Sequence, residues 1–205
     1  MKKFILLLLV GYLLQSCCIE KKQSYPYSYF DVSIGKTVIV WPGHEISYVD
    51  PVGAQVGFET KVMELNEKSS INSGLNISFQ GSKYEDPESS GSVNLAYLNL
   101  PILYCYEFGH GFYGETGLQP GLLIGAKDKY NGESYDYKDQ VKKFELGLPV
   151  GAGYNFKNGF GLGARATYGL TNLNNSEYEE GKLHNLMVVA VFRYKFNWSM
   201  LDKLK

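Results

Sequence analysis

The chain has 205 residues and a formal net charge of −1, with 44% hydrophobic and 20% charged residues, so nothing in its charge points to nucleic acid as a partner. It is rich in Tyr (17), Phe (11) and Gly (23). Together with short, evenly spaced apolar runs, this composition favours an all-β barrel over a helical fold.

The N-terminus has the pattern of a secretory signal. A basic start followed by an apolar run up to Leu14, too short to span a bilayer as a helix, predicts a signal peptide over residues 1–18. The sequence Leu-Gln-Ser-Cys that ends at Cys17 resembles the lipobox of bacterial lipoproteins, which would make Cys17 a lipidated first residue. Ordinary cleavage after Cys18 is the alternative, and the sequence leaves both open.

Eight segments alternate apolar and polar residues with the period of two that β-strands have. In the clearest pair, around residues 157–159, one face is wholly apolar and the other is glycine with isolated charges, which predicts a long hairpin. The predicted strands are residues 29–41, 51–64, 70–80, 93–108, 112–126, 144–156, 160–170 and 185–196. Pro101 removes a ladder donor from the fourth strand, where we expect a bulge or a local break.

The connections between these strands sort by length. Those after the first, third, fifth and seventh strands are long and polar, and residues 81–91 and 127–140 are expected to be loops. The other three are tight. This sorting is typical of outer-membrane barrels with both termini in the periplasm, whose apolar face meets lipid.

The sequence therefore predicts an all-β, eight-stranded antiparallel up-and-down transmembrane β-barrel over residues 29–196. A periplasmic lead-in, residues 19–28, precedes it, and a short tail, residues 197–205, follows it. Aromatic residues at the strand ends beside the tight turns predict a periplasmic girdle at the level of the lipid headgroups. They are Tyr104, Tyr106, Phe108, Phe112, Tyr154, Phe156, Phe160, Tyr194 and Phe196.

An eight-stranded barrel is just wide enough for its own side chains to fill. The inward phase carries both arginines of the chain, and an arginine fork can serve two carboxylates. The predicted ion-pair network of the lumen is Asp31, Glu59, Lys61, Glu107, Glu115, Glu145, Arg165, Arg193 and Lys195. Because an unpaired buried charge costs several kcal/mol, we favour an ion-paired plug over a narrow conducting pore.

Five ordered motifs carry a family resemblance that is densest after Leu95. They are LNLPIL (98–103), GFYGETG (111–117), GLPVGAGY (147–154), GLGARATYGLT (161–171) and FRYKF (192–196). This pattern resembles the PorT-type outer-membrane β-barrel proteins of the Bacteroidetes, a porin-like family. The resemblance implies a role in secretion across the outer membrane, with secretion-system components as partners and the barrel-assembly machinery acting during insertion.

Two departures from that family stand out. Its chains usually stop at the last aromatic residue, whereas this chain continues after Phe196. The lipobox-like sequence at Cys17 is the second departure. Either one would imply a modified route of insertion.

The histidines are the obvious catalytic candidates. His110 lies in a tight turn, and closure of the barrel would bring His44 and His184 to the same outer rim. A rim hydrolase is thus one hypothesis, but the sequence places no nucleophile, base and orienting group together. Two histidines without a fixed spacing specify no metal site. We therefore predict no enzyme activity, no cofactor and no metal. Cys105 has no partner thiol and is expected to be a small core residue.

Two further alternatives concern the glycine run at residues 159–163 and the loop at residues 127–140. No helix follows the glycines, so they are expected to relieve crowding in the lumen rather than to bind a nucleotide. The Tyr-rich loop is either adhesive or simply solvated, and the solvated alternative is favoured.

The leading functional prediction is a non-enzymatic integral outer-membrane barrel, a scaffold or accessory of transport or secretion. The alternative is a soluble lipocalin-like barrel that binds a small ligand, in which the apolar face would point inward. The Gly-x-Trp signature of lipocalins is missing near the first strand.

Overall fold

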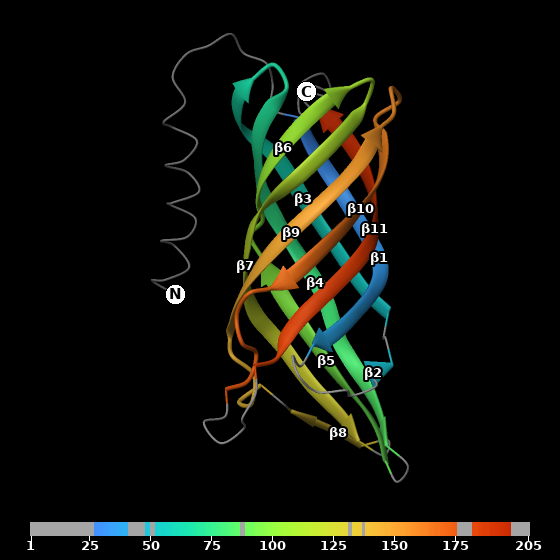
Figure 1. Ribbon diagram of the computed structural model, residues 1–205, viewed down its shortest axis with the longest axis vertical. Helices are drawn as coiled ribbons and strands as arrows, with labels where there is room; N and C mark the ends of the chain where they lie inside the picture. Colours follow the sequence, from blue (N-terminus) through green and yellow to red (C-terminus); the bar gives the residue numbers. More distant parts are fainter. Residues whose placement is uncertain are drawn as a thin grey trace, which may run out of the picture.

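The computed structural model describes residues 27–40, 48–49, 52–86, 89–130, 133–136, 138–175 and 182–197. Within these residues the chain forms one antiparallel sheet, shown in Figure 1. Its strands are β1 (Tyr27–Val40), β2 (Tyr48–Val49), β3 (Val52–Asn66), β4 (Ser69–Asp86), β5 (Ser89–Asn99), β6 (Ile102–Gly109), β7 (Phe112–Tyr130), β8 (Glu133–Asp136), β9 (Phe144–Asn155), β10 (Phe160–Gly169) and β11 (His184–Asn197). None of the described residues belongs to a helix long and apolar enough to cross a bilayer.

The sheet closes into a barrel because its first and last strands pair. β1 pairs with β11 along its whole length, from Tyr27↔Asn197 to Val40↔His184, and pairs with β3 on its other side. β4, then β5 with β6, then β7, β9 and β10 complete the ring. A closed ladder leaves no unpaired edge, which is the condition for a sheet in hydrocarbon. The predicted eight-stranded antiparallel barrel is confirmed.

The two ends of the barrel differ. The tight turns β3–β4, β6–β7 and β9–β10 lie at the end where Tyr27 pairs with Asn197, which we call the turn end. The wide connections lie at the opposite end, which we call the loop end. β1 begins at Tyr27, so the last two residues of the predicted lead-in are already strand.

The predicted fourth strand is interrupted where Pro101 was expected to break it. β5 ends at Asn99 and β6 begins at Ile102, and β4 pairs with both. The ladder to β7 continues across the break, because the backbone N–H of Leu100 donates to the carbonyl of Pro120 at 2.9 Å. The break therefore bends one barrel strand without opening the wall.

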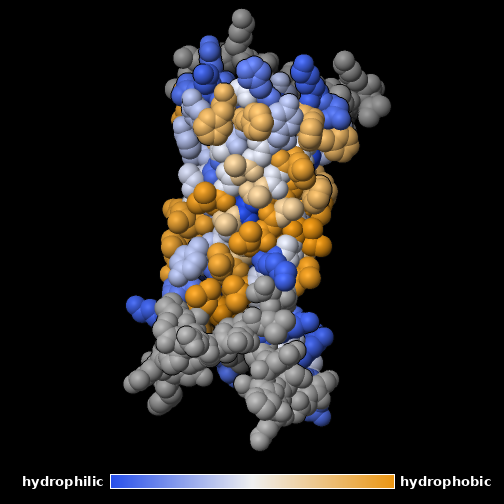
Figure 2. Space-filling view, turned by 45° about the vertical axis from the view of Figure 1, so that its right-hand side comes forward, coloured by the Kyte–Doolittle hydropathy of each residue, from blue (hydrophilic) through white to orange (hydrophobic). Residues whose placement is uncertain are grey.

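The apolar face of each strand points outward. Phe144, Leu162 and Phe192 are 50%, 46% and 52% exposed, whereas Arg165 and Arg193 are 1% and 4% exposed. Figure 2 shows the outward apolar residues as a belt between hydrophilic ends. A soluble lipocalin-like barrel requires the opposite arrangement, so that alternative is wrong.

Aromatic rings from neighbouring strands meet on the outer wall at the turn end. Tyr154 contacts Phe112 and Phe156 edge-on, each with ring centroids 4.9 Å apart, and Phe160 lies 5.0 Å from Tyr194. These are residues of the predicted girdle, and they lie where the apolar belt gives way to the turns.

At the loop end the strands run further than predicted. β4 continues to Asp86 and β5 starts at Ser89, where a loop was expected, and β7 continues to Tyr130 and pairs with β8. Polar hairpins outside the membrane satisfy their backbone groups by pairing, without an apolar face to reveal them in the sequence. We call this projection, made of β2, the loop-end parts of β4, β5 and β7, and β8, the raised wall.

Inward glycines allow the barrel strands to approach closely. A Cβ at Gly117 would lie 2.0 Å from the backbone oxygen of Ile102 on the paired strand β6. Because that neighbour is backbone, it cannot move aside as a flexible side chain would.

We therefore expect Gly117→Ala to destabilise the barrel by about 1–3 kcal/mol, the usual range for overpacking. Urea unfolding of the protein in lipid vesicles, followed by the gel mobility of unheated samples, measures this change. The control is Ala152→Val on the exposed outer wall, where lipid accommodates the added methyl groups. Equal unfolding midpoints for the wild type and Gly117→Ala would show that the ladder has room for this Cβ.

Candidate functional site

Five charged side chains from five strands meet inside the barrel, in the half nearer the turn end. We call them the lumen cluster. They are Asp31 (β1), Glu59 (β3), Glu115 (β7), Arg165 (β10) and Arg193 (β11), and each is 5% exposed or less. Residues far apart in the chain thus come together only because the barrel closes.

Each arginine of the lumen cluster serves two carboxylates. Arg165 donates from Nε to Glu115 at 2.7 Å and from Nη2 to Glu59 at 2.9 Å. Arg193 donates from Nη2 to the second oxygen of Glu115 at 3.2 Å, and its Nε lies 3.4 Å from Asp31. Glu115 therefore bridges the two guanidinium groups.

Two inward tyrosines complete the surroundings of Arg193. Its guanidinium carbon lies 4.4 Å from the ring centroid of Tyr113 and 5.2 Å from that of Tyr29. Such cation–π contacts partly replace the water that a buried guanidinium has lost.

The glycine-rich inward faces of β9 and β10 make room for the large side chains of the lumen cluster and of Tyr113. A Cβ at Gly151 would lie 2.9 Å from the Glu115 carboxylate, and one at Gly161 would lie 2.7 Å from Cγ of Arg193. The large side chains of β7 and β11 thus occupy the space that β9 and β10 leave. Within the glycine run, Gly161 and Gly163 have this packing role, since a Cβ at Gly163 would lie 2.7 Å from the Tyr113 hydroxyl.

The other four residues of the predicted network lie apart from the cluster. Glu145 is buried nearer the loop end, where it accepts a hydrogen bond from Nδ2 of Asn185 at 2.8 Å. Lys61 and Lys195 are half-buried at the turn end, and Glu107 is exposed there. Within the part of the chain that the structure describes, none of these four takes part in the ion pairs of the lumen cluster.

Uncharged polar side chains fill part of the interior toward the loop end. Nδ2 of Asn99 donates to Asn76 at 2.7 Å and to Ser78 at 3.0 Å, and all three residues are buried. Apart from Glu145, the buried charged side chains of the described residues thus lie at one level of the lumen.

The loop end of the lumen is covered by an apolar cluster, which we call the mouth cap. Its buried residues are Ile39, Leu95, Tyr97, Ala126, Val141 and Leu173. Val141 and Leu173 come from two connections that the sequence analysis treated only as polar loops. Backbone hydrogen bonds connect these loops. The N–H of Lys142 donates to the carbonyl of Leu173, and the N–H of Leu173 donates to the carbonyl of Leu183, each at 2.8 Å.

The histidines form no catalytic arrangement within the described residues. His184 Nδ1 lies 2.7 Å from the backbone oxygen of Gly169, and the ring stacks on Tyr168. His110 is exposed in a tight turn with φ of 55°. The described part of the chain holds no group of three potential metal ligands. His44, Cys17, the predicted signal peptide and most of the predicted tail lie outside the described residues.

Solved structures share the fold. The crystal structure of Neisserial surface protein A is 14% identical with a TM-score of 0.50, covering 86% of this chain and 100% of that chain. OprG from Pseudomonas aeruginosa is 12% identical (TM-score 0.44, 88% and 100% covered), and the outer membrane enzyme PagL is 11% identical (TM-score 0.46, 81% and 98% covered). At 14% identity, the likeness to Neisserial surface protein A indicates the fold and not an activity.

No curated protein matches the chain. Residues 10–175 match the family described as the outer membrane protein beta-barrel domain. The match spans most of the chain, and the outward apolar belt agrees with the location that the family name gives. The chain therefore belongs to the outer membrane protein beta-barrel domain family and is an integral β-barrel of the outer membrane.

Proposed function

We propose that this protein is a closed, non-enzymatic scaffold of PorT type, an accessory of outer-membrane transport or secretion. The observation that carries the proposal is the filled interior, with the lumen cluster toward one end and the mouth cap at the other. A barrel closed in this way acts through its two ends. Secretion-system components would be its partners, after insertion by the barrel-assembly machinery.

The ion pairs suit a permanent plug. Desolvation of two arginines and three carboxylates is costly, and the charges remain inside only because each arginine holds two partners. Removing one partner leaves an uncompensated buried charge, which typically costs about 3–5 kcal/mol. The same energy opposes any motion that would separate the pairs and open the lumen.

The raised wall supports the scaffold role. Phe79 of β4 is exposed on the apolar belt, and the strand continues from there to Asp86. At roughly 3.3 Å per residue, this part of β4 extends the strand by about 23 Å beyond Phe79. It remains paired with β5, and β5 pairs with β7 up to Gly91↔Tyr130. A paired ribbon presents a defined surface to a partner without an ordering penalty on binding.

The same proposal orients the protein. Tyr27 and Asn197 pair at the turn end, so both termini leave the barrel on one side. Outer-membrane barrels keep their short turns in the periplasm and their long loops outside. We place both termini in the periplasm and the raised wall outside the cell.

The plug predicts a strong effect of Arg165→Met, which leaves Glu59 and Glu115 without their shared partner. We expect a loss of about 3–5 kcal/mol in urea unfolding in vesicles. Adding Glu59→Gln and Glu115→Gln should restore part of that loss, because the uncompensated charges are gone. Lys61→Met is the control, since Lys61 lies outside the lumen cluster. If the triple variant is less stable than Arg165→Met, charge imbalance does not cause the loss.

The closed interior predicts that the purified protein gives no stepwise current in a planar lipid bilayer. Val141→Ser with Leu173→Ser, which weakens the mouth cap, should also be silent because the lumen cluster still blocks the passage. Heat-modifiable gel mobility confirms that each sample is folded. Steady open-channel currents from the folded wild type would contradict the scaffold proposal in favour of a pore.

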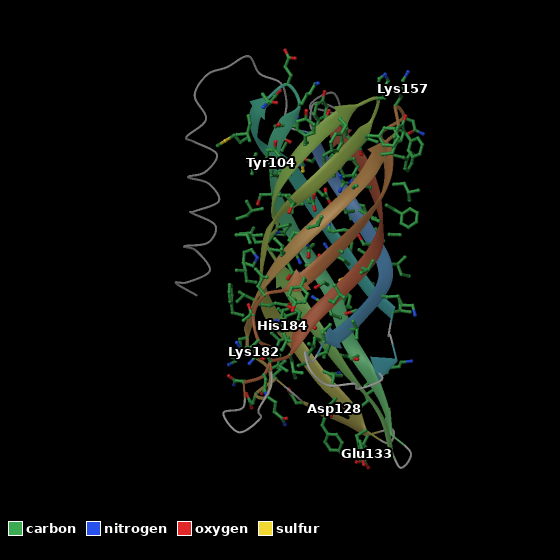
Figure 3. The ribbon with its side chains drawn as sticks, in the orientation of Figure 1. Tyr104, Asp128, Glu133, Lys157, Lys182 and His184 are labelled. Carbon is green, nitrogen blue, oxygen red and sulfur yellow. The ribbon has the colours of Figure 1, made fainter. Side chains whose placement is uncertain are left out.

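The orientation predicts opposite labelling of the two ends. Lys182→Cys at the loop end should react with a membrane-impermeant maleimide on intact cells, whereas Lys157→Cys at the turn end should react only after lysis. Figure 3 shows these two lysines at opposite ends. The unsubstituted chain serves as the background. Labelling of Lys157→Cys alone on intact cells would invert the proposed topology.

A further inference from the structure

The outer wall of β7 changes from apolar to basic near the loop end. Leu118, Leu122 and Ile124 are 46%, 52% and 48% exposed, and Lys127 is the first charged residue after them. On the neighbouring strand, β9 begins with the exposed residue Phe144, which pairs with Leu122. The lipid-facing surface therefore ends beside Ile124.

A hollow of about 470 Å³ lies at this boundary, and we call it the lysine hollow. The residues that matter for its chemistry are Ile124, Lys127, Ser134, Tyr135, Asp136 and Lys138. It arises from a gap in the ladder. β9 leaves β7 at Leu122↔Phe144, and the N–H of Leu123 still donates to the carbonyl of Lys143 at 2.8 Å. β8 joins β7 only at Lys127↔Asp136, so residues 124–126 at the loop end have no strand partner on that side.

The hollow holds two lysines that form no ion pair with any residue that the structure describes, together with Asp136, which lies opposite Lys127 in the β7–β8 ladder. Oδ1 of Asp136 accepts from the backbone N–H of Lys138 at 3.0 Å, and Tyr135 donates its hydroxyl to Glu133. That hydrogen bond to a carboxylate raises the pKa of the Tyr135 phenol, which keeps it protonated. Among the described residues, no carboxylate forms an ion pair with Lys127 or Lys138. Lys127, Lys138 and Ser134 thus line one space, which they share with Asp136, so the two lysines outnumber the single carboxylate there.

We propose that the lysine hollow binds the phosphate-bearing headgroup of a membrane lipid, whose acyl chains lie along Ile124, Leu122 and Phe144. Lysine binds phosphate as a point charge, and Ser134 adds a hydrogen-bond donor. The apolar rim is continuous with the lipid-facing belt, which a free phosphate ion would leave unused. Charge and apolar surface therefore select a lipid over a soluble anion.

This inference goes beyond the proposed scaffold function and does not depend on it. It requires the outward apolar belt and the gap between β8 and β9, both of which are independent of whether the lumen conducts. A current through the barrel would overturn the closed scaffold and leave the lipid site standing.

The test uses the full-length protein in phosphatidylcholine nanodiscs doped with lipid A, a glycolipid with phosphate groups, and counts bound lipid by native mass spectrometry. Each lysine near an anionic lipid surface contributes roughly fivefold, so Lys127→Ala with Lys138→Ala should weaken binding about 25-fold. Lys68→Ala with Lys157→Ala removes the same charge from exposed sites at the turn end and should leave binding unchanged.

Lys127→Gln with Lys138→Gln, which keeps more of the side chain, should lose affinity like the alanine pair, and heat-modifiable mobility verifies that both are folded. Unchanged lipid binding in the folded double variants would overturn the proposal. An equal loss of lipid binding in the Lys68→Ala, Lys157→Ala control would also overturn it, because binding would then depend only on the net charge of the protein. A second arm adds millimolar inorganic phosphate. Retained lipid is the expected result, and displacement would assign the hollow to a soluble anion instead.

Discussion

Backbone pairing in hydrocarbon is the constraint on which this structure depends. A lipid-exposed strand cannot leave its N–H and C=O groups unpaired, and the pairing of β1 with β11 removes the last free edge. Closure with eight strands also fixes the width of the interior, which side chains must then fill. The period of two sends most Phe and Leu side chains of the barrel strands outward and most Gly, Ser, Asn and charged side chains inward. Met187, Val189 and Val191 of β11 are inward apolar exceptions. Large inward residues on β7 and β11, such as Tyr113 and Arg193, fit because β9 and β10 present glycine to them.

The lumen cluster fixes the register in which the strands of the closed barrel pair. Arg165 and Glu59 are separated by 106 positions in the chain, yet they form a direct hydrogen bond inside the barrel. A slip of one residue in β10 would turn Arg165 toward lipid and leave Glu59 and Glu115 unpaired. Hydrophobic side chains of similar volume could fill the same space, and buried ion pairs are often no better for stability. The cluster is therefore better explained by register than by stability, since it links β1, β3, β7, β10 and β11 through contacts that tolerate only one alignment.

Sequence periodicity predicted the eight barrel strands and the inward direction of both arginines, because each follows from the side-chain pattern of a single strand. The break at Pro101 was predicted for another reason, since proline has no backbone N–H to donate to the ladder. It could not tell that Glu145 stands apart from Arg165, because that depends on the stagger between strands. The mouth cap was missed for a different reason. Val141 and Leu173 are isolated apolar residues in polar segments, and neither has a periodic neighbour to mark it. The raised wall was missed because its polar strands have no apolar face.

The mouth cap also links the two parts of the loop end. Leu95 and Ala126 lie at the base of the raised wall, on β5 and β7, while Val141 and Leu173 belong to the two connections that cross the opening. A single apolar core thus fixes the wall to those connections. Because their positions are already determined, a partner of the proposed scaffold would meet a prearranged surface there, and binding would cost less conformational entropy than the ordering of free loops. The lumen cluster and the fixed loop end both support the proposed scaffold, since each would favour recognition at the surface over passage through the barrel.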